Sequence, residues 1–140
     1  MKKIAGLGFI ITMTAAQMVL GLRPPLREEQ RQEYASNIVT GYVFAVKSEI
    51  VTPANARYEM TDKIYHVSIF VGSTEKGDAF VPGQVLEFSF WKANTRPDGM
   101  TGDFGQYQVP KQQTLIRAYL IKDENGQFNL LHPNGFDEIG

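Results

Sequence analysis

Five short segments of the chain alternate apolar and polar residues, as strands that bury one face do. In one of them, Tyr65, Val67 and Ile69 alternate with His66 and Ser68. The predicted strands are residues 37–46, 64–71, 84–91, 114–121 and 128–131. Turn-forming residues separate them, including an Asn-Gly pair at 125–126 that suits a tight hairpin. The pattern therefore predicts an all-β barrel or sandwich.

The strand count fits a five-stranded Greek-key barrel of the OB type. Gly41 lies inside the first predicted strand, where a glycine often marks a bulge. A bulge there would let one long strand serve both halves of the barrel. The apolar residues on the in-phase faces of the strands form the predicted core: Val67, Ile69, Leu86, Phe88, Phe90 and Leu120.

The first 22 residues have the three parts of a secretory signal peptide. Lys2 and Lys3 precede an uncharged apolar run over 4–13, and Thr14-Ala15-Ala16 supplies small residues. We expect cleavage after Ala16, with Gly21 as the alternative site. The other interpretation is a buried first strand or helix. Residues 23–36 follow as a linker or a short N-terminal helix, and residues 37–140 as the barrel domain.

Charge and cysteine content narrow the function classes. Removing Lys2 and Lys3 from the 14 basic residues leaves 12 against 15 acidic residues, a net charge of −3. Without a basic block, neither nucleic-acid binding nor attachment to an anionic membrane is expected. The absence of cysteine excludes thiol enzymes and cysteine-ligated metals. We expect a secreted or periplasmic protein with no stable membrane insertion after signal cleavage.

Three segments resemble a known family. SNIVTGYVFAV (36–46), YHVSIFVGSTEKGD (65–78) and TLIRAYL (114–120) are similar to the core strands of the netrin-type module, which includes the tissue inhibitors of metalloproteinases. The resemblance implies an OB fold. Those inhibitors chelate the enzyme's metal through an N-terminal cysteine, which this chain lacks. The resemblance therefore does not imply that mechanism of inhibition.

The chain also resembles small bacterial secreted proteins over most of residues 36–136. The resemblance lies in W-x(4)-RPDG-x-x-G at residues 91–102 and in LL-x-PNGF at residues 130–136. It implies a similar fold and carries no activity with it.

No motif for catalysis or for a cofactor is present in the sequence. His66 and His132 lack metal-ligand spacing, although His132 could pair with Asp137 or Glu138. The loop 98–103 lacks the alternating acids of a calcium loop. Neither a nucleophile elbow nor a phosphate loop occurs. We therefore expect no enzyme activity, no cofactor and no metal.

The long connection over residues 92–113 is the candidate binding region, because loops of this length are often functional. Trp91, Arg96, Phe104 and Tyr107 belong to the residue types that dominate binding interfaces. The alternative is that Trp91 and Phe104 only pin the loop onto the barrel. We expect a secreted, non-catalytic binding module for a protein or a small molecule. The alternative is a structural or accessory domain of a bacterial envelope assembly.

Overall fold

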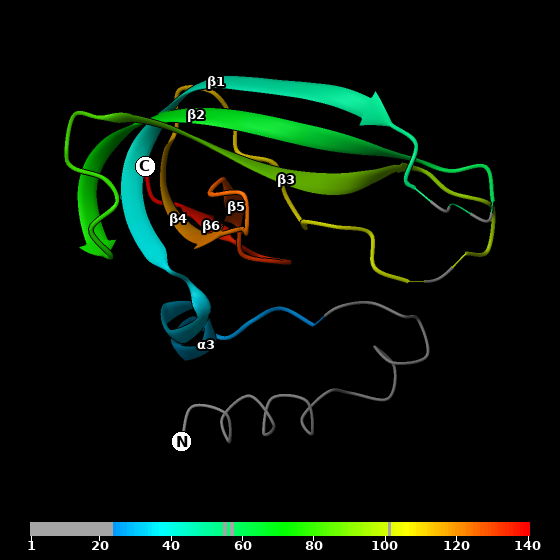
Figure 1. Cartoon of the computed structure of the whole chain (residues 1–140), viewed down its shortest axis with the longest axis horizontal. Coiled ribbons are helices and arrows are strands. Elements are labelled where there is room, and N and C mark those ends of the chain that lie inside the picture. The colour runs from blue at the N-terminus through cyan, green and yellow to red at the C-terminus, as the bar shows by residue number, and fades with distance from the viewer. Residues whose placement is uncertain (1–23, 55, 57, 101) are drawn as a thin grey trace.

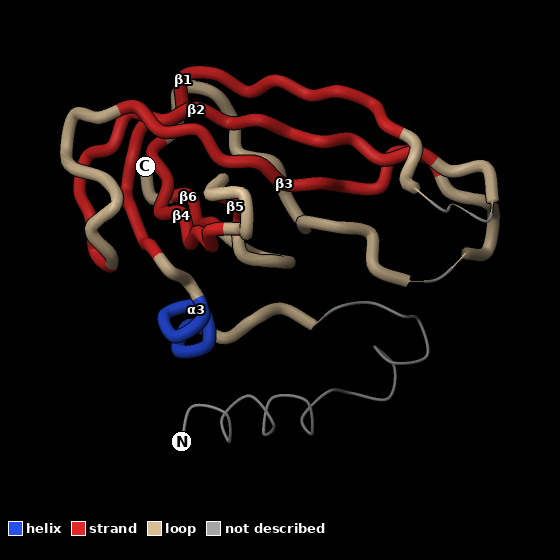
Figure 2. The backbone as a smooth tube through the Cα atoms, in the orientation of Figure 1, coloured by secondary structure: helices blue, strands red, loops and turns tan. Residues whose placement is uncertain are grey.

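The computed structural model describes residues 24–54, 56, 58–100 and 102–140, and it is mostly β with one short helix (Figures 1 and 2). The elements are α3 (Glu28–Tyr34), β1 (Asn37–Val51), β2 (Thr61–Lys76), β3 (Val85–Thr95), β4 (Leu115–Lys122), β5 (Phe128–Leu130) and β6 (Phe136–Glu138). The predicted signal peptide and its cleavage sites lie outside the described residues. Among the residues described, no helix is long and apolar enough to cross a membrane.

Five strands close into a barrel. Their order is β1-β2-β3-β5-β4, and β4 pairs again with β1 from Asn37↔Leu120 to Tyr42↔Leu115. All neighbouring pairs are antiparallel except β3 and β5. The closure confirms the all-β prediction and excludes the sandwich. The predicted strands missed β6, a three-residue strand that pairs with residues 116–118 of β4.

The first three strands are longer than their apolar patterns predicted. The first predicted strand ended at residue 46 and the second began at residue 64, but β1 continues to Val51 and β2 begins at Thr61. Likewise, β3 continues to Thr95. The three strands run on together past the closed barrel (Figure 1). These added ends are rich in polar residues because they extend beyond the core, so the alternation used to find strands fades there.

Gly41 has the predicted role in β1. The register with β2 shifts between Thr40 and Gly41, and this half of β1 pairs with both β2 and β4. A Cβ atom at Gly41 would overlap the backbone carbonyl oxygen of Phe70. Only glycine therefore lets β2 approach at this point, and one strand serves both sides of the barrel.

The interior of the barrel is a single buried apolar cluster. It contains all six of the predicted core residues, and Phe88 is only 1% exposed. A second, smaller cluster lies on the outer wall beneath α3. It consists of Ala35, Ile38, Tyr119 and Leu131, with Leu26 and Tyr34 packed against it. The helix therefore covers one apolar part of the outer wall.

Polar contacts fix α3 in place on that cluster. The guanidinium of Arg31 donates two hydrogen bonds of 3.0 Å to the carboxylate of Asp137, and it lies 4.4 Å from the ring centre of Tyr119. The Tyr119 hydroxyl donates to Glu28 at 2.8 Å. Burial and this bond raise the pKa of Tyr119 to about 12. Hydrogen bonds from Gln32 and Tyr119 in turn lower the pKa of Glu28.

Candidate functional site

The four predicted binding residues, Trp91, Arg96, Phe104 and Tyr107, lie in different environments. Trp91 stacks on His132 with 5.9 Å between ring centres. Phe104 and Tyr107 have exposed side chains. Arg96 is held at the end of β3, where it pairs with Asp62 at 2.5 Å and donates to the backbone carbonyls of Thr61 and Thr95. The arginine is thus engaged in joining β2 to β3.

Part of the long loop is fastened to β3. The backbone N–H of Ala93 donates to Phe104, and that of Gln106 donates to Trp91, at 2.9 and 3.0 Å. Gly105, at φ +93°, sits so close to Trp91 that a Cβ atom would overlap its carbonyl oxygen. Residues 104–106 therefore extend the sheet locally, as expected of a loop that is pinned to the barrel.

Lys92 and Gln106 add side-chain contacts to this junction. The ammonium group of Lys92 donates to the backbone carbonyls of Gln106 and Tyr107, and burial lowers the pKa of the lysine. The buried amide of Gln106 donates to the Leu131 carbonyl and accepts from the Gly135 N–H. The side chains of Lys92 and Gln106 thus hold the loop against the barrel, and these contacts account for their burial.

Both histidines pair with carboxylates, and the partner of His132 is not one of the two that were expected. His132 Nε2 lies 2.6 Å from Asp103 Oδ2, so the expected pairing with Asp137 or Glu138 is wrong. Asp137 instead binds Arg31. The fold of the loop explains the difference, because it carries Asp103 back to the turn that holds His132.

His66 forms a hydrogen-bonded row that sequence reasoning missed. Its Nε2 lies 3.0 Å from Glu49, and its Nδ1 lies 2.8 Å from Ser89 Oγ. A serine, a histidine and a carboxylate in this order are the groups of an acyl-transfer triad. Acyl transfer also needs backbone N–H donors that face the substrate. Ser89 lies inside β3, with His66 on one side and Asn129 on the other, so its backbone belongs to the sheet. The row is a link between strands. Within the described residues, no group of three or more potential ligands suits a metal ion.

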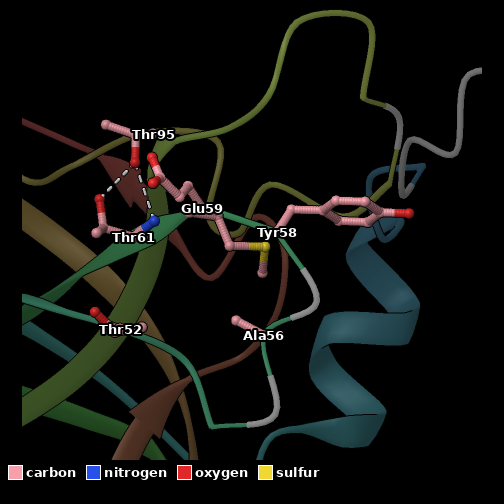
Figure 3. A pocket seen from close by; sticks show the side chains of 7 residues that line it. Thr52, Ala56, Tyr58, Glu59, Thr61 and Thr95 are labelled. Carbon is pink, nitrogen blue, oxygen red and sulfur yellow. Dashed lines mark hydrogen bonds between the residues drawn. The ribbon is translucent and has the colours of Figure 1, made fainter.

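A hollow lies at the far end of the β1–β3 extension. It has a volume of about 670 Å³ and is open to solvent. In Figure 3, Thr61 and Thr95 point toward one another and are hydrogen-bonded, whereas Tyr58 extends away from them. Glu59 is the one charged residue among the described lining residues. The described lining residues therefore do not supply the convergent polar groups that orient a small ligand.

A row of exposed apolar side chains crosses the outer wall of the barrel. Leu115, Tyr42, Phe70 and Val85 lie directly opposite one another on β4, β1, β2 and β3. They are 40%, 41%, 46% and 52% exposed. Phe44 stacks on Phe70 with 4.4 Å between ring centres. We call these five residues the apolar row.

The alternation of the strands explains why the apolar row faces outward. The neighbours of these residues along the strands, among them Val71, Leu86 and Ile116, point into the core. Phe44 lies two residues after Tyr42 and therefore on the same face, at the point where the β1–β2 register shifts between Val43 and Ala45. The single-sequence pattern could not show the row, because four separate strands contribute to it.

Polar pairs border the apolar row on the side toward the start of β1. Thr40 and Ser73 share a hydrogen bond of 2.5 Å. Arg117 binds both carboxylate oxygens of Glu75, at 3.1 and 3.0 Å. An apolar centre with a polar border is the common anatomy of a protein–protein interface.

No family model matches the chain, and no match was found among curated proteins or solved structures.

Proposed function

We propose that this protein is a secreted, non-catalytic binding module that binds a partner protein through the apolar row. The observation that carries the proposal is the register of Leu115, Tyr42, Phe70 and Val85, which places four exposed apolar side chains in one line. Contiguous exposed apolar surface with a polar border marks interaction sites on soluble domains.

The shape of the surface favours a protein over a small molecule. Small ligands bind in concave pockets with a few converging polar groups, whereas the apolar row lies on the convex wall of a barrel. Tyr42, Phe44 and Phe70 also supply large contact areas at low conformational cost, as aromatic residues do in binding sites. The partner we propose therefore presents an apolar patch of its own.

The way in which α3 covers only one apolar part of the outer wall supports the same proposal. The chain covers the apolar cluster around Tyr119 with α3. It leaves Tyr42 and Phe70 open, although they lie on the same wall. Apolar surface that the described chain does not cover is available to a second molecule.

We also propose a specific fold type for the barrel. We assign it to the OB type, of which the netrin-type module is one form. The strand order β1-β2-β3-β5-β4, the parallel β3–β5 pair and a first strand that pairs on both sides support this assignment.

The experiment uses a photo-crosslinking residue at position 70 of the full chain, exposed to the extracellular or periplasmic fraction. The unlabelled parent protein should compete for the crosslinked product. The double variant Phe70→Ser/Tyr42→Ser should compete about 30-fold less well, as expected when central aromatic residues are lost.

Tyr58→Ser is the matched control, because Tyr58 is an exposed aromatic residue outside the apolar row. It should compete as well as the parent. Equal competition by the double variant and the parent would overturn the proposal, provided that both proteins have the same melting curve.

A further inference from the structure

One edge of β1 is open over half its length. β4 pairs with residues 37–42. Val43 then exchanges backbone hydrogen bonds with Thr114 and Gln113, and the side-chain amide of Gln112 donates to the Phe44 carbonyl. Beyond them, no described strand lies beside residues 45–51, which pair with β2 on the other side only. Figure 1 shows this part of β1 along the rim of the sheet. We call residues 45–51 the free edge. Such an edge offers unpaired backbone groups to another strand.

The sequence of the free edge is complementary to itself. In an antiparallel pair centred on Ser48, Lys47 lies opposite Glu49 of the second copy, and Glu49 opposite its Lys47. The same register places Val46 opposite Ile50 on the other face. Opposite charges and apolar residues in these positions stabilise a strand pair. We propose that the free edge pairs with the free edge of a second copy around a twofold axis at Ser48.

The neighbouring registers are worse, so the proposed one is specific. Moving the centre to Lys47 or to Glu49 places two like charges opposite each other. A centre midway between two residues is excluded, because a twofold antiparallel pair sets side chains of the same face opposite each other. Because side chains alternate between the two faces, only the register centred on Ser48 matches charge with charge and apolar with apolar.

Exposure is consistent with this arrangement. Lys47, Ser48, Glu49 and Ile50 are all exposed, and Ile50 is 60% exposed. A twofold pair uses the same patch on both copies, so every favourable contact occurs twice. A single pair of seven-residue edges buries less area than a permanent dimer does. We therefore expect a reversible dimer whose population rises with concentration.

The first test uses the absence of cysteine from the chain. Ser48→Cys places two thiols opposite each other across the axis, so mild oxidation should join the copies by a disulfide. Ile50→Cys is the matched control, because its two copies would lie about 13 Å apart along the strands. That separation is too great for a disulfide. Equal crosslinking of the two folded variants would overturn the register.

The second test reverses the charges. Lys47→Glu and Glu49→Lys should each weaken the dimer about tenfold in sedimentation equilibrium, because both ion pairs become like-charge pairs. The double variant should restore the parent's dissociation constant. Since both Glu49→Lys proteins lose the bond to His66, that loss cannot explain a difference between them.

Three outcomes would overturn the inference. The parent protein could remain monomeric at millimolar concentration. The double variant could remain as weak as the single variants. The dimer could persist in the charge variants and be lost in Phe70→Ser/Tyr42→Ser, which would assign it to the apolar row. The last result would leave the proposed binding surface standing and change only its occupant.

Discussion

Tyr119 and Tyr42 stand on the outer wall of the same barrel, yet the chain treats them in opposite ways. Tyr119 is fully buried beneath α3. Its hydroxyl donates to Glu28 and its ring lies under the guanidinium of Arg31, both residues of that helix. Tyr42 is 41% exposed and lies in a line of bare apolar neighbours. The composition of the two patches is similar, so the difference lies in what covers them.

In the covered patch, α3 and its flanking residues shield the apolar surface from solvent. Leu26 and Tyr34 supply apolar cover, and Arg31 pairs with Asp137 beside it. The apolar row has the centre and the border of such a site without the covering element. This contrast is why we propose the apolar row as a surface for another molecule.

The largest effect should separate the inner face from the bare outer face. We expect Phe88→Ala to lower the free energy of unfolding by about 3–5 kcal/mol, because it opens a cavity in the core. Phe70→Ala, the matched change on the outer wall, should cost about 1 kcal/mol or less, because its side chain is nearly half exposed. Denaturant melts of both variants measure the difference, and equal losses would contradict the assignment of faces.

The second effect separates the covered patch from the bare one. An unfolded tyrosine loses its proton near pH 10, whereas Tyr119 holds its proton until about pH 12 because its pKa is raised. The unfolded state therefore binds fewer protons in this window, and stability falls as the pH rises through it. A shift of this size corresponds to about 2–3 kcal/mol.

Tyr119→Phe should not show the fall in stability between about pH 10 and pH 12 that the Tyr119 hydroxyl causes, whereas Tyr42→Phe should still show it. Melts at pH 9 to 12 test the expectation. If both variants lose stability in parallel with the parent, Tyr119 is not the group that α3 protects.

The smallest effect sharpens the comparison at the long loop. Arg96→Ala should cost about 1–2 kcal/mol, because it leaves Asp62 and two backbone carbonyls of β2 and β3 without their partner. Tyr107→Ala should change stability by about 0.5 kcal/mol or less, because the side chain is exposed. Chemical melts of the single variants would show whether these two residues belong to the covered or to the bare surface.

If Tyr107→Ala also competes poorly in the crosslinking experiment, the recognition surface includes the loop. Full competition would restrict recognition to the apolar row. An Arg96→Ala protein as stable as the parent would contradict the structural role of that ion pair.

The sequence was a good guide to the interior and a poor one to the surface. Strands and core followed from alternation, because burying one face imposes a period of two on residues such as Val67, Ile69, Leu86 and Phe88. The prediction that Gly41 bends a shared strand was confirmed for a local steric reason.

Surface groupings depend on register and closure, which no single segment encodes. Leu115 meets Tyr42 only when β4 closes the barrel on β1. Ser89 meets His66 only through the β2–β3 register. Asp103 reaches His132 only because the long loop folds back. Trp91 and Arg96 were selected by residue type alone. Residue type does not show that Trp91 stacks on His132 or that Arg96 pairs with Asp62.

The closure of β1 on β4 also bears on the time course of folding. The strands β1, β2 and β3 follow one another along the chain and form contacts between near neighbours. The contact of Asn37 with Leu120 must instead close a loop of most of the domain, and non-local contacts of this kind slow folding. Until β4 arrives, the whole 15-residue length of β1 has one open edge, including the half that the finished barrel protects. The proposed pairing between copies should therefore be strongest during refolding, when the open edge of β1 is about twice as long as in the finished molecule.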